Sequence, residues 1–309
     1  MGMIMNSART AFTSMLLALA REDQTLYAVA TDSRGSVTLT DFAAELPNQF
    51  VECGIAEQNA IGISAGLANG GLRPFVCGPA CFYSLRSAEQ VKVDVGYSQM
   101  NVKIVGVSGG ISYGALGATH HATQDIALMR AVAGLEIFLP SDAPQMAAMT
   151  RYLAASDAPA YIRMGRGAVP TIYQENAPFI PGKANCLNKG KDAAIIACGE
   201  MVYPALQAAA ILAQEGLYVS VYDMHTLRPL DEEAILKAAE TGFVVTAEEH
   251  SIHGGLGGAV AELLSQKRPT RMRILGLPDE KLYNGNSAQV LTHYGLTADG
   301  IAQTLRLER

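Results

Sequence analysis

Residues 52–71 read Glu-Cys-Gly-Ile-Ala-Glu-Gln-Asn-Ala-Ile-Gly-Ile-Ser-Ala-Gly-Leu-Ala-Asn-Gly-Gly and are the most informative stretch of the chain. One carboxylate, Glu57, stands at the start of a helical run of small and apolar residues, with Gly62 and Gly66 on or near one face. Glycine costs a helix interior about 1 kcal/mol relative to alanine, so a sequence keeps it where the backbone must approach something closely. A glutamate in that setting is expected to be desolvated, and a desolvated carboxyl holds its proton more readily, which suits proton transfer. The alternative is a first-turn acid stabilised by the helix dipole.

Outward from this stretch, short apolar runs alternate with helical patterns. The expected strands of the first half are 26–30, 50–53, 74–77, 102–107, 136–139 and 160–163. The expected helices are 11–20, 56–67, 84–95, 125–133 and 143–155. Short buried strands that alternate with helices are typical of α/β folds with doubly wound, mainly parallel sheets flanked by helices. In such folds a ligand binds at the carboxyl ends of the strands.

The alternation stops between residues 173 and 191, where proline, glycine and asparagine predict a linker. A second alternation then begins. Its expected strands are 193–197, 218–222, 243–246 and 272–275, and its expected helices are 201–214, 231–239, 257–265 and 288–293. The sequence therefore predicts two doubly wound α/β domains, residues 1–172 and 192–309, joined by the linker 173–191.

Composition narrows the function classes. The chain has 309 residues, of which 49% are hydrophobic, so each domain can bury a sizeable core. Its net charge is −6 and its basic residues are not clustered, which argues against nucleic-acid and anionic-membrane partners. The five cysteines are odd in number and lie mostly in apolar contexts, as expected of reduced thiols in a cytoplasmic protein. The apolar piece 12–20 is too short to span a membrane.

The segment Gly-Ile-Ala-Glu-Gln at 54–58 resembles the transketolase family of thiamine-diphosphate enzymes. In that family this segment opens the helix with the glutamate that activates the cofactor, by a hydrogen bond to N1′ of its aminopyrimidine. The resemblance implies this role for Glu57. It extends over essentially the whole chain, which corresponds to the pyrimidine-binding and C-terminal domains of a transketolase.

The family holds the pyrimidine ring on an aromatic surface. The segment 74–90, Pro-Phe-Val-Cys-Gly-Pro-Ala-Cys-Phe-Tyr-Ser-Leu-Arg-Ser-Ala-Glu-Gln, is similar to the aromatic-rich run that provides this surface. Counting back from Arg86 places Tyr83 on a family aromatic position, and the adjacent Phe82 could substitute for it. The alternative is that both are ordinary core aromatics. The resemblance also implies that Arg86 is one of the cofactor-binding residues and that Asp32 lies on the thiazolium side of the cofactor.

A glycine-rich segment, 108–125, contains Gly-Ala-Thr-His and resembles the family motif whose histidine faces the reacting carbons. His120 takes that place, with His121 beside it, and an imidazole there can move a substrate hydroxyl proton. Transketolases carry an aspartate four residues before this histidine and a second histidine twelve residues before it. Here these positions are Leu116 and Ser108, so the usual sugar specificity is in doubt.

Three positions are similar to the family's grip on the substrate phosphate. They are Arg9, Ser36 and Arg166, with Arg163 as a second choice. Arginine suits phosphate because its planar guanidinium donates two parallel hydrogen bonds.

The family binds its metal through Gly-Asp-Gly and a downstream asparagine, and no Gly-Asp-Gly occurs in this sequence. The chain is therefore identified as resembling the C-terminal subunit of a split transketolase, with no metal ligands of its own. The resemblance implies that an N-terminal partner subunit holds the diphosphate and Mg²⁺ or Ca²⁺. It also implies an α2β2 assembly and transfer of a two-carbon ketol unit from a ketose phosphate to an aldose.

Three alternatives stay open at this point. One is a split transketolase for an unusual sugar, branched or sulfonated. Another is a subunit similar to deoxyxylulose-phosphate synthase or to the β chain of 2-oxoacid dehydrogenases, which decarboxylation of a 2-oxoacid would reveal. The last is a non-catalytic assembly subunit, against which the retained Glu57, His120 and His121 argue.

Overall fold

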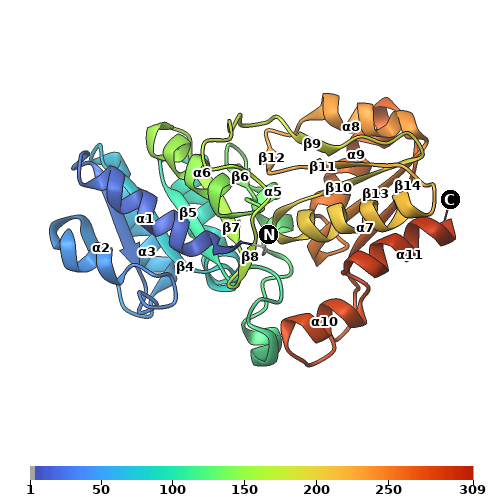
Figure 1. Ribbon diagram of the computed structural model, residues 1–309. Coiled ribbons are helices and arrows are strands. Elements are labelled where there is room, and N and C mark those ends of the chain that lie inside the picture. Colours follow the sequence, from blue (N-terminus) through green and yellow to red (C-terminus); the bar gives the residue numbers. More distant parts are fainter. Residues whose placement is uncertain (1–3, 309) are drawn as a thin grey trace.

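The computed structural model describes residues 4–308 and contains two α/β domains side by side (Figure 1). The first is built on a seven-stranded sheet. Its strands, in spatial order, are β12 (Thr226–Arg228), β6 (Glu136–Phe138), β7 (Ala160–Met164), β5 (Lys103–Val107), β4 (Arg73–Pro79), β2 (Leu26–Ala30) and β3 (Phe50–Glu52). Every pairing is parallel except that of β12 with β6.

Helices cover both faces of this sheet. They are α1 (Ala8–Ala20), α2 (Thr40–Glu45), α3 (Glu57–Asn69), α4 (Ala88–Gln90), α5 (Asp125–Ala131) and α6 (Ala143–Ala155). Helices α1 and α6 pack against each other, and α3 lies against β4. Shorter helical pieces are η1 (Pro47–Gln49), η2 (Phe82–Arg86), η3 (Val91–Tyr97) and η4 (Gly114–Thr119). A separate antiparallel pair joins β1 (Met5–Ser7) to β8 (Ala168–Pro170).

The second domain has a five-stranded sheet. Its strands, in spatial order, are β14 (Arg271–Leu277), β13 (Phe243–Ser251), β10 (Ala193–Ala197), β11 (Val219–Asp223) and β9 (Asn185–Asn188). All pairings are parallel except that of β9 with β11. Its helical elements are η5 (Gly199–Met201), α7 (Val202–Gln214), α8 (Glu232–Ala238), η6 (Ala239–Thr241), α9 (Leu256–Lys267), α10 (Ser287–His293) and α11 (Ala298–Glu308).

The predicted fold class is confirmed, and several differences in detail have local causes. The helix expected at 84–95 is two π-helical turns, η2 and η3, on either side of the short α4, because Ser87 departs from helical geometry with φ −105° and ψ 18°. Within the expected linker 173–191, residues 185–188 form β9 and join the second sheet. Helices α2 and α11 were not predicted. No helix in the part of the chain that is described is long and apolar enough to cross a bilayer.

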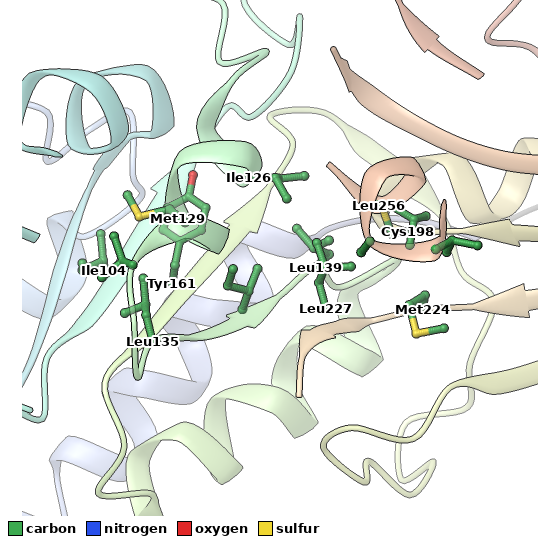
Figure 2. Close-up of a cluster of buried hydrophobic side chains, with 14 of the residues drawn as sticks. Ile104, Ile126, Met129, Leu135, Leu139, Tyr161, Cys198, Met224, Leu227 and Leu256 are labelled. Atoms are coloured by element: carbon green, nitrogen blue, oxygen red, sulfur yellow. The ribbon is translucent and has the colours of Figure 1, made fainter. Parts of the chain in front are cut away.

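One of the hydrophobic clusters spans both domains. Figure 2 shows Ile104, Leu135 and Tyr161 of the first domain continuing through Leu139 to Cys198 of the second. Strand β12 reinforces this junction, since it belongs to the second domain in sequence but extends the first sheet beside β6. The domains are therefore held by a continuous apolar contact as well as by the chain connection.

A buried ion pair lies at the same junction. The Arg163 guanidinium, at the end of β7, is 3.1 Å from the carboxylate of Asp125 at the start of α5. Asp125 also accepts a hydrogen bond from the Tyr161 hydroxyl at 2.6 Å. The other side of Arg163 donates to the backbone carbonyl of Glu249 in β13 at 2.5 Å. One arginine thus ties a strand and a helix of the first domain to the central region of the second.

We expect Arg163→Met to destabilise the protein strongly, because it leaves Asp125 as a buried carboxylate without its cation. Removing one partner of a buried ion pair costs about 3–5 kcal/mol, which urea unfolding followed by circular dichroism would report as a lower midpoint. Arg151→Met is the matched control, since Arg151 is an exposed arginine of α6, and its midpoint should stay near that of the parent. Equal midpoints for the two variants would contradict the role given to the pair.

Candidate functional site

Glu57 is the first residue of α3 and is buried, with 3% of its surface exposed. Strand β3 ends at Glu52, and Gly54 then takes a left-handed φ of 68°, which turns the chain into the helix. One carboxylate oxygen, Oε2, accepts a hydrogen bond from Nη1 of Arg86 at 2.8 Å. The other oxygen, Oε1, has no hydrogen bond within the described part of the chain. The carboxyl is therefore largely shielded from water. Arg86 holds its Oε2, and its Oε1 can accept a hydrogen bond from a ligand.

The aromatic ring of Phe82 packs against the Glu57–Arg86 ion pair. The Arg86 guanidinium lies over the ring of Phe82, 4.1 Å from its centroid. Both residues belong to the π-helical turn η2, which follows β4. Phe82 is half-buried, so one part of its ring faces solvent beside the buried Glu57.

His120 lies on the far side of Phe82. Its ring meets Phe82 edge-on at 5.5 Å and Tyr113 edge-on at 5.2 Å between centroids. Its Nδ1 is 2.9 Å from the Thr119 hydroxyl, which fixes the orientation of the ring. The imidazole is half-buried between two aromatic rings, with its Nε2 unused by any described hydrogen bond.

Two arginines complete the arrangement. The Arg166 guanidinium stands 5.0 Å from the centroid of Tyr113. Arg9 donates to the backbone carbonyl of Arg166 at 2.6 Å and to that of Ser36 at 2.5 Å. Burial lowers the pKa of Arg9, and the neighbouring positive charge of Arg166 lowers it further. Arg9 Nε and Arg166 Nη1 are buried atoms with no hydrogen-bond partner, so this cationic end has unused donors.

These residues form one continuous series of contacts, which we call the contact row. Its members, in order, are Glu57, Arg86, Phe82, His120, Tyr113, Arg166, Arg9 and Ser36. Most of them follow the carboxyl ends of parallel strands: Ser36 follows β2, Glu57 follows β3, Phe82 follows β4, Tyr113 follows β5 and Arg166 follows β7. That edge of a parallel sheet is where ligands of doubly wound folds bind.

Four residues predicted for the site lie outside the contact row. Tyr83 is fully buried and its hydroxyl contacts that of Thr31 at 3.3 Å, so it offers no face to a ligand. Arg163 is held in the ion pair at the domain junction. Asp32 is exposed and turns away with a left-handed φ of 52°.

His121 is the fourth. It is 5% exposed, and its Nε2 lies 2.8 Å from the backbone carbonyl of Gly114. Its Nδ1 is buried without a partner. This histidine therefore supports the loop that carries His120, and its second ring nitrogen makes no hydrogen bond.

The structure also adds a residue that the sequence did not single out. Tyr113 bridges His120 and Arg166, and without it the contact row would break into two parts. Its position in the Gly-Gly-Ile-Ser-Tyr-Gly segment, seven residues before His120, is the one signal that could have drawn attention to it.

The site meets part of what a thiamine-type cofactor requires. A dry carboxylate with one unused oxygen and a half-exposed aromatic ring suit an aminopyrimidine. A diphosphate also needs a metal, and among residues 4–308 no group of three or more His, Cys, Asp or Glu side chains could hold one. The residues present fit one end of the cofactor. Together with the fold, they define an α/β protein with a candidate ligand site at the strand ends that suits one end of such a cofactor.

Comparison with known proteins identifies the family. The model of the transketolase pyrimidine-binding domain matches residues 5–171, and that of the transketolase C-terminal domain matches residues 182–301. An apulose-4-phosphate transketolase subunit from Phocaeicola vulgatus is 56% identical over 97% of this chain and 96% of its own length. The 6-deoxy-6-sulfo-D-fructose transketolase subunit SqwH from Clostridium sp. is 38% identical over 96% of this chain and 92% of its own.

A solved structure leads to the same family. A split gene transketolase, in the form of an inactive beta4 tetramer, superposes with a TM-score of 0.88 at 37% identity, covering 97% of each chain. The chain belongs to the transketolase family, whose members depend on thiamine diphosphate. The predicted resemblance to the C-terminal subunit of a split transketolase is confirmed.

We expect Phe82, and not Tyr83, to provide the surface for the cofactor. Phe82→Ala removes the ring between Arg86 and His120 and should weaken binding of thiamine diphosphate by the two-subunit complex about tenfold or more, which corresponds to about 1.4 kcal/mol. Tyr83→Phe removes only a buried hydroxyl and should leave the affinity unchanged. Calorimetric titration of the cofactor measures both, and a larger loss in Tyr83→Phe would reverse the assignment.

Proposed function

We propose that this chain is the C-terminal subunit of a split, thiamine-diphosphate-dependent transketolase of the cytoplasm. The complete enzyme transfers a two-carbon ketol unit between a ketose phosphate and an aldose. The observation that carries this proposal is the contact row, because it joins a dry glutamate, an aromatic surface, a histidine and an arginine pair along one edge of a sheet.

Glu57 and Phe82 serve the cofactor. When bound, the cofactor supplies the carbon nucleophile that ketol transfer needs. Glu57 shares a proton with N1′ of the aminopyrimidine through the oxygen that Arg86 leaves unused, and its burial excludes competing water. Phe82 packs against the ring, and Arg86 fixes both side chains in place.

His120 serves the substrate. Its free Nε2 can take a hydroxyl proton from the sugar or donate to an oxygen on which negative charge develops. The Thr119 hydroxyl at Nδ1 and the two flanking rings hold the imidazole in one orientation. His121 acts through the loop, by positioning Gly114 and with it the segment that ends at His120.

Arg9, Arg166 and Ser36 bind the anionic end of the substrate. The unpartnered nitrogens of both arginines supply donors to a phosphate without breaking an existing bond. The Ser36 carbonyl accepts a hydrogen bond from Arg9 and so fixes the position of its guanidinium. The Ser36 hydroxyl remains available to the ligand. This end lies across His120 from Glu57, so the sugar is bound between the cofactor and the phosphate grip.

A partner subunit completes the enzyme. We propose that an N-terminal transketolase subunit holds the diphosphate and Mg²⁺ or Ca²⁺, in an α2β2 assembly. Two observations support this: the described residues contain no metal cluster, and the related split gene transketolase chain by itself is an inactive beta4 tetramer.

The substrate is proposed to be a branched ketose phosphate of the apulose 4-phosphate kind. The relative with 56% identity is named for that sugar, and the relative with 38% identity is named for a sulfonated one. Two local features support a non-standard donor. Leu116 is 56% exposed where common transketolases carry an acid, and Ser108 is fully buried, so neither replaces the usual polar contact.

Reconstitution tests the proposed function. The isolated chain should bind thiamine diphosphate weakly and transfer no ketol unit, whereas the chain mixed with its N-terminal partner should do both. A panel of apulose 4-phosphate, 6-deoxy-6-sulfofructose, fructose 6-phosphate and xylulose 5-phosphate then orders the donors by kcat/KM. Activity of the isolated chain, decarboxylation of a 2-oxoacid, or preference for the common donors would each overturn part of the proposal.

We expect Glu57→Gln to reduce ketol transfer by the complex about 10²–10⁴-fold, the range for loss of one acid–base group. The amide keeps the shape of the side chain but cannot share a carboxyl proton. Glu89→Gln, an exposed glutamate of the neighbouring α4, is the matched control and should be fully active. Circular dichroism and partner binding confirm that both variants fold, and comparable activities would remove Glu57 from the mechanism.

A further inference from the structure

Glu200, in the second domain, lies next to the segment of Arg166. Arg166 and Arg9 belong to the end of the contact row that is proposed to bind the substrate phosphate. It lies in η5, directly after Gly199, whose left-handed φ of 55° turns the chain at the carboxyl end of β10. Its carboxyl lies on the backbone of Gly165, so close that a Cβ added there would be 1.8 Å from Glu200 Oε1. A glycine is therefore required at position 165 for the carboxyl to occupy this place.

The Glu200 carboxyl has no partner of its own. Within residues 4–308 it makes no ion pair within 4.0 Å and no side-chain hydrogen bond, although it is half-buried. The charged groups that face it are Glu249 of β13, Arg163 of β7 and Arg9 of α1. Arg163 and Glu249 are satisfied elsewhere, by Asp125 and by the backbone N–H of Ile111 respectively. Glu200 is thus an unused acid next to an arginine pair with unused donors.

The link to the arginines runs through one peptide. Gly165, on which the carboxyl lies, directly precedes Arg166, and the carbonyl of Arg166 accepts the hydrogen bond from Arg9. Arg9 Nε and Arg166 Nη1, both buried, have no partner. The charge of Glu200 acts on Arg9, so an anion bound by Arg9 would have Glu200 as an acidic neighbour.

Charge decides what Glu200 can do there. Burial and then the negative charge of Glu249 raise the pKa of Glu200, Arg163 and Arg9 oppose the rise, and the resulting pKa is about 8. At pH 7 the carboxylic acid is protonated and can donate a hydrogen bond to an anion. Once ionised, it would repel that anion and compete with it for the arginines.

We propose that Glu200 is a third component of the anion-binding site, and that its protonated carboxyl donates a hydrogen bond to a substrate phosphate oxygen bound by Arg9 and Arg166. This inference rests on the proposed function, which assigns a phosphate to the arginine pair. It gives the second domain a direct part in substrate recognition and links the affinity for the anion to the protonation of one side chain.

The pH dependence has a definite sign. A phosphate monoester is already mostly a dianion above pH 7, so the group that titrates between pH 7 and 9 is Glu200. With a pKa of about 8, affinity should be nearly full at pH 7, about half of that at pH 8 and about tenfold lower at pH 9, because only the protonated acid donates. Glu200→Gln donates at every pH and should remove this fall.

The probe is methyl phosphate, a simple phosphate monoester, titrated into the full-length chain with ³¹P NMR at pH 7, 8 and 9 and at constant salt. Arg166→Met should weaken the binding, which locates the phosphate, and Glu22→Gln, an exposed glutamate, should behave as the parent. Gly165→Ala displaces the carboxyl and serves as a second, geometric test that should also flatten the profile. The steady-state KM for the ketose phosphate in the two-subunit complex should follow the same profile, with kcat little changed.

Each result decides one point. A profile in Glu200→Gln identical to that of the parent, or phosphate binding insensitive to Arg166→Met, overturns the inference. Absence of ketol transfer by the complex overturns the proposed function alone, since phosphate binding to the chain is measured without turnover.

Discussion

The ion pair of Arg163 with Asp125 is the interaction on which the site depends. It lies at the carboxyl end of β7, is almost free of solvent and extends through a backbone hydrogen bond to Glu249 of the second domain. A buried charge is costly without its partner, so this pair allows one relative placement of the two domains. Arg166 lies three residues further along the chain, so the pair also anchors the start of the segment that leads to Arg166.

The sequence predicted the fold class and singled out Glu57 and His120, which the structure places in one contact row. Prediction failed where the geometry changes within a few residues. Glu57 and His120 were found because each opens or closes a short motif. Phe82 and Tyr83 could not be separated, since a π-helical turn of η2 decides which ring faces inward, and that turn depends on packing against α3 and α5. Arg163 lies within β7, where its side chain is buried, whereas Arg166 lies two residues after the end of the strand.

Contacts between distant segments were beyond any local pattern. Strand β12 pairs with β6 although the two lie far apart in the sequence, and Glu200 meets Gly165 across the linker. Neither has a sequence signature, because both depend on how the second domain packs against the first sheet. The same packing brings charged residues of both domains together at this edge of the first sheet: Arg9, Arg163 and Arg166 from the first domain, and Glu200 and Glu249 from the second.

The ion pair of Glu57 with Arg86, at one end of the contact row, differs from the Arg163–Asp125 pair in its exposure to solvent. Glu57 is 3% exposed, but its partner Arg86 has 44% of its side chain exposed. Exposed pairs contribute about 0–1 kcal/mol, whereas breaking a fully buried pair costs about 3–5 kcal/mol. The Glu57–Arg86 pair lies between these limits, since only one side is dry. A ligand that offers Glu57 a good donor can therefore share it with Arg86 at small cost, whereas Arg163 could not be exchanged without loosening the domain junction. The fully buried pair therefore lies in the core, and the pair that can exchange partners lies at the candidate site.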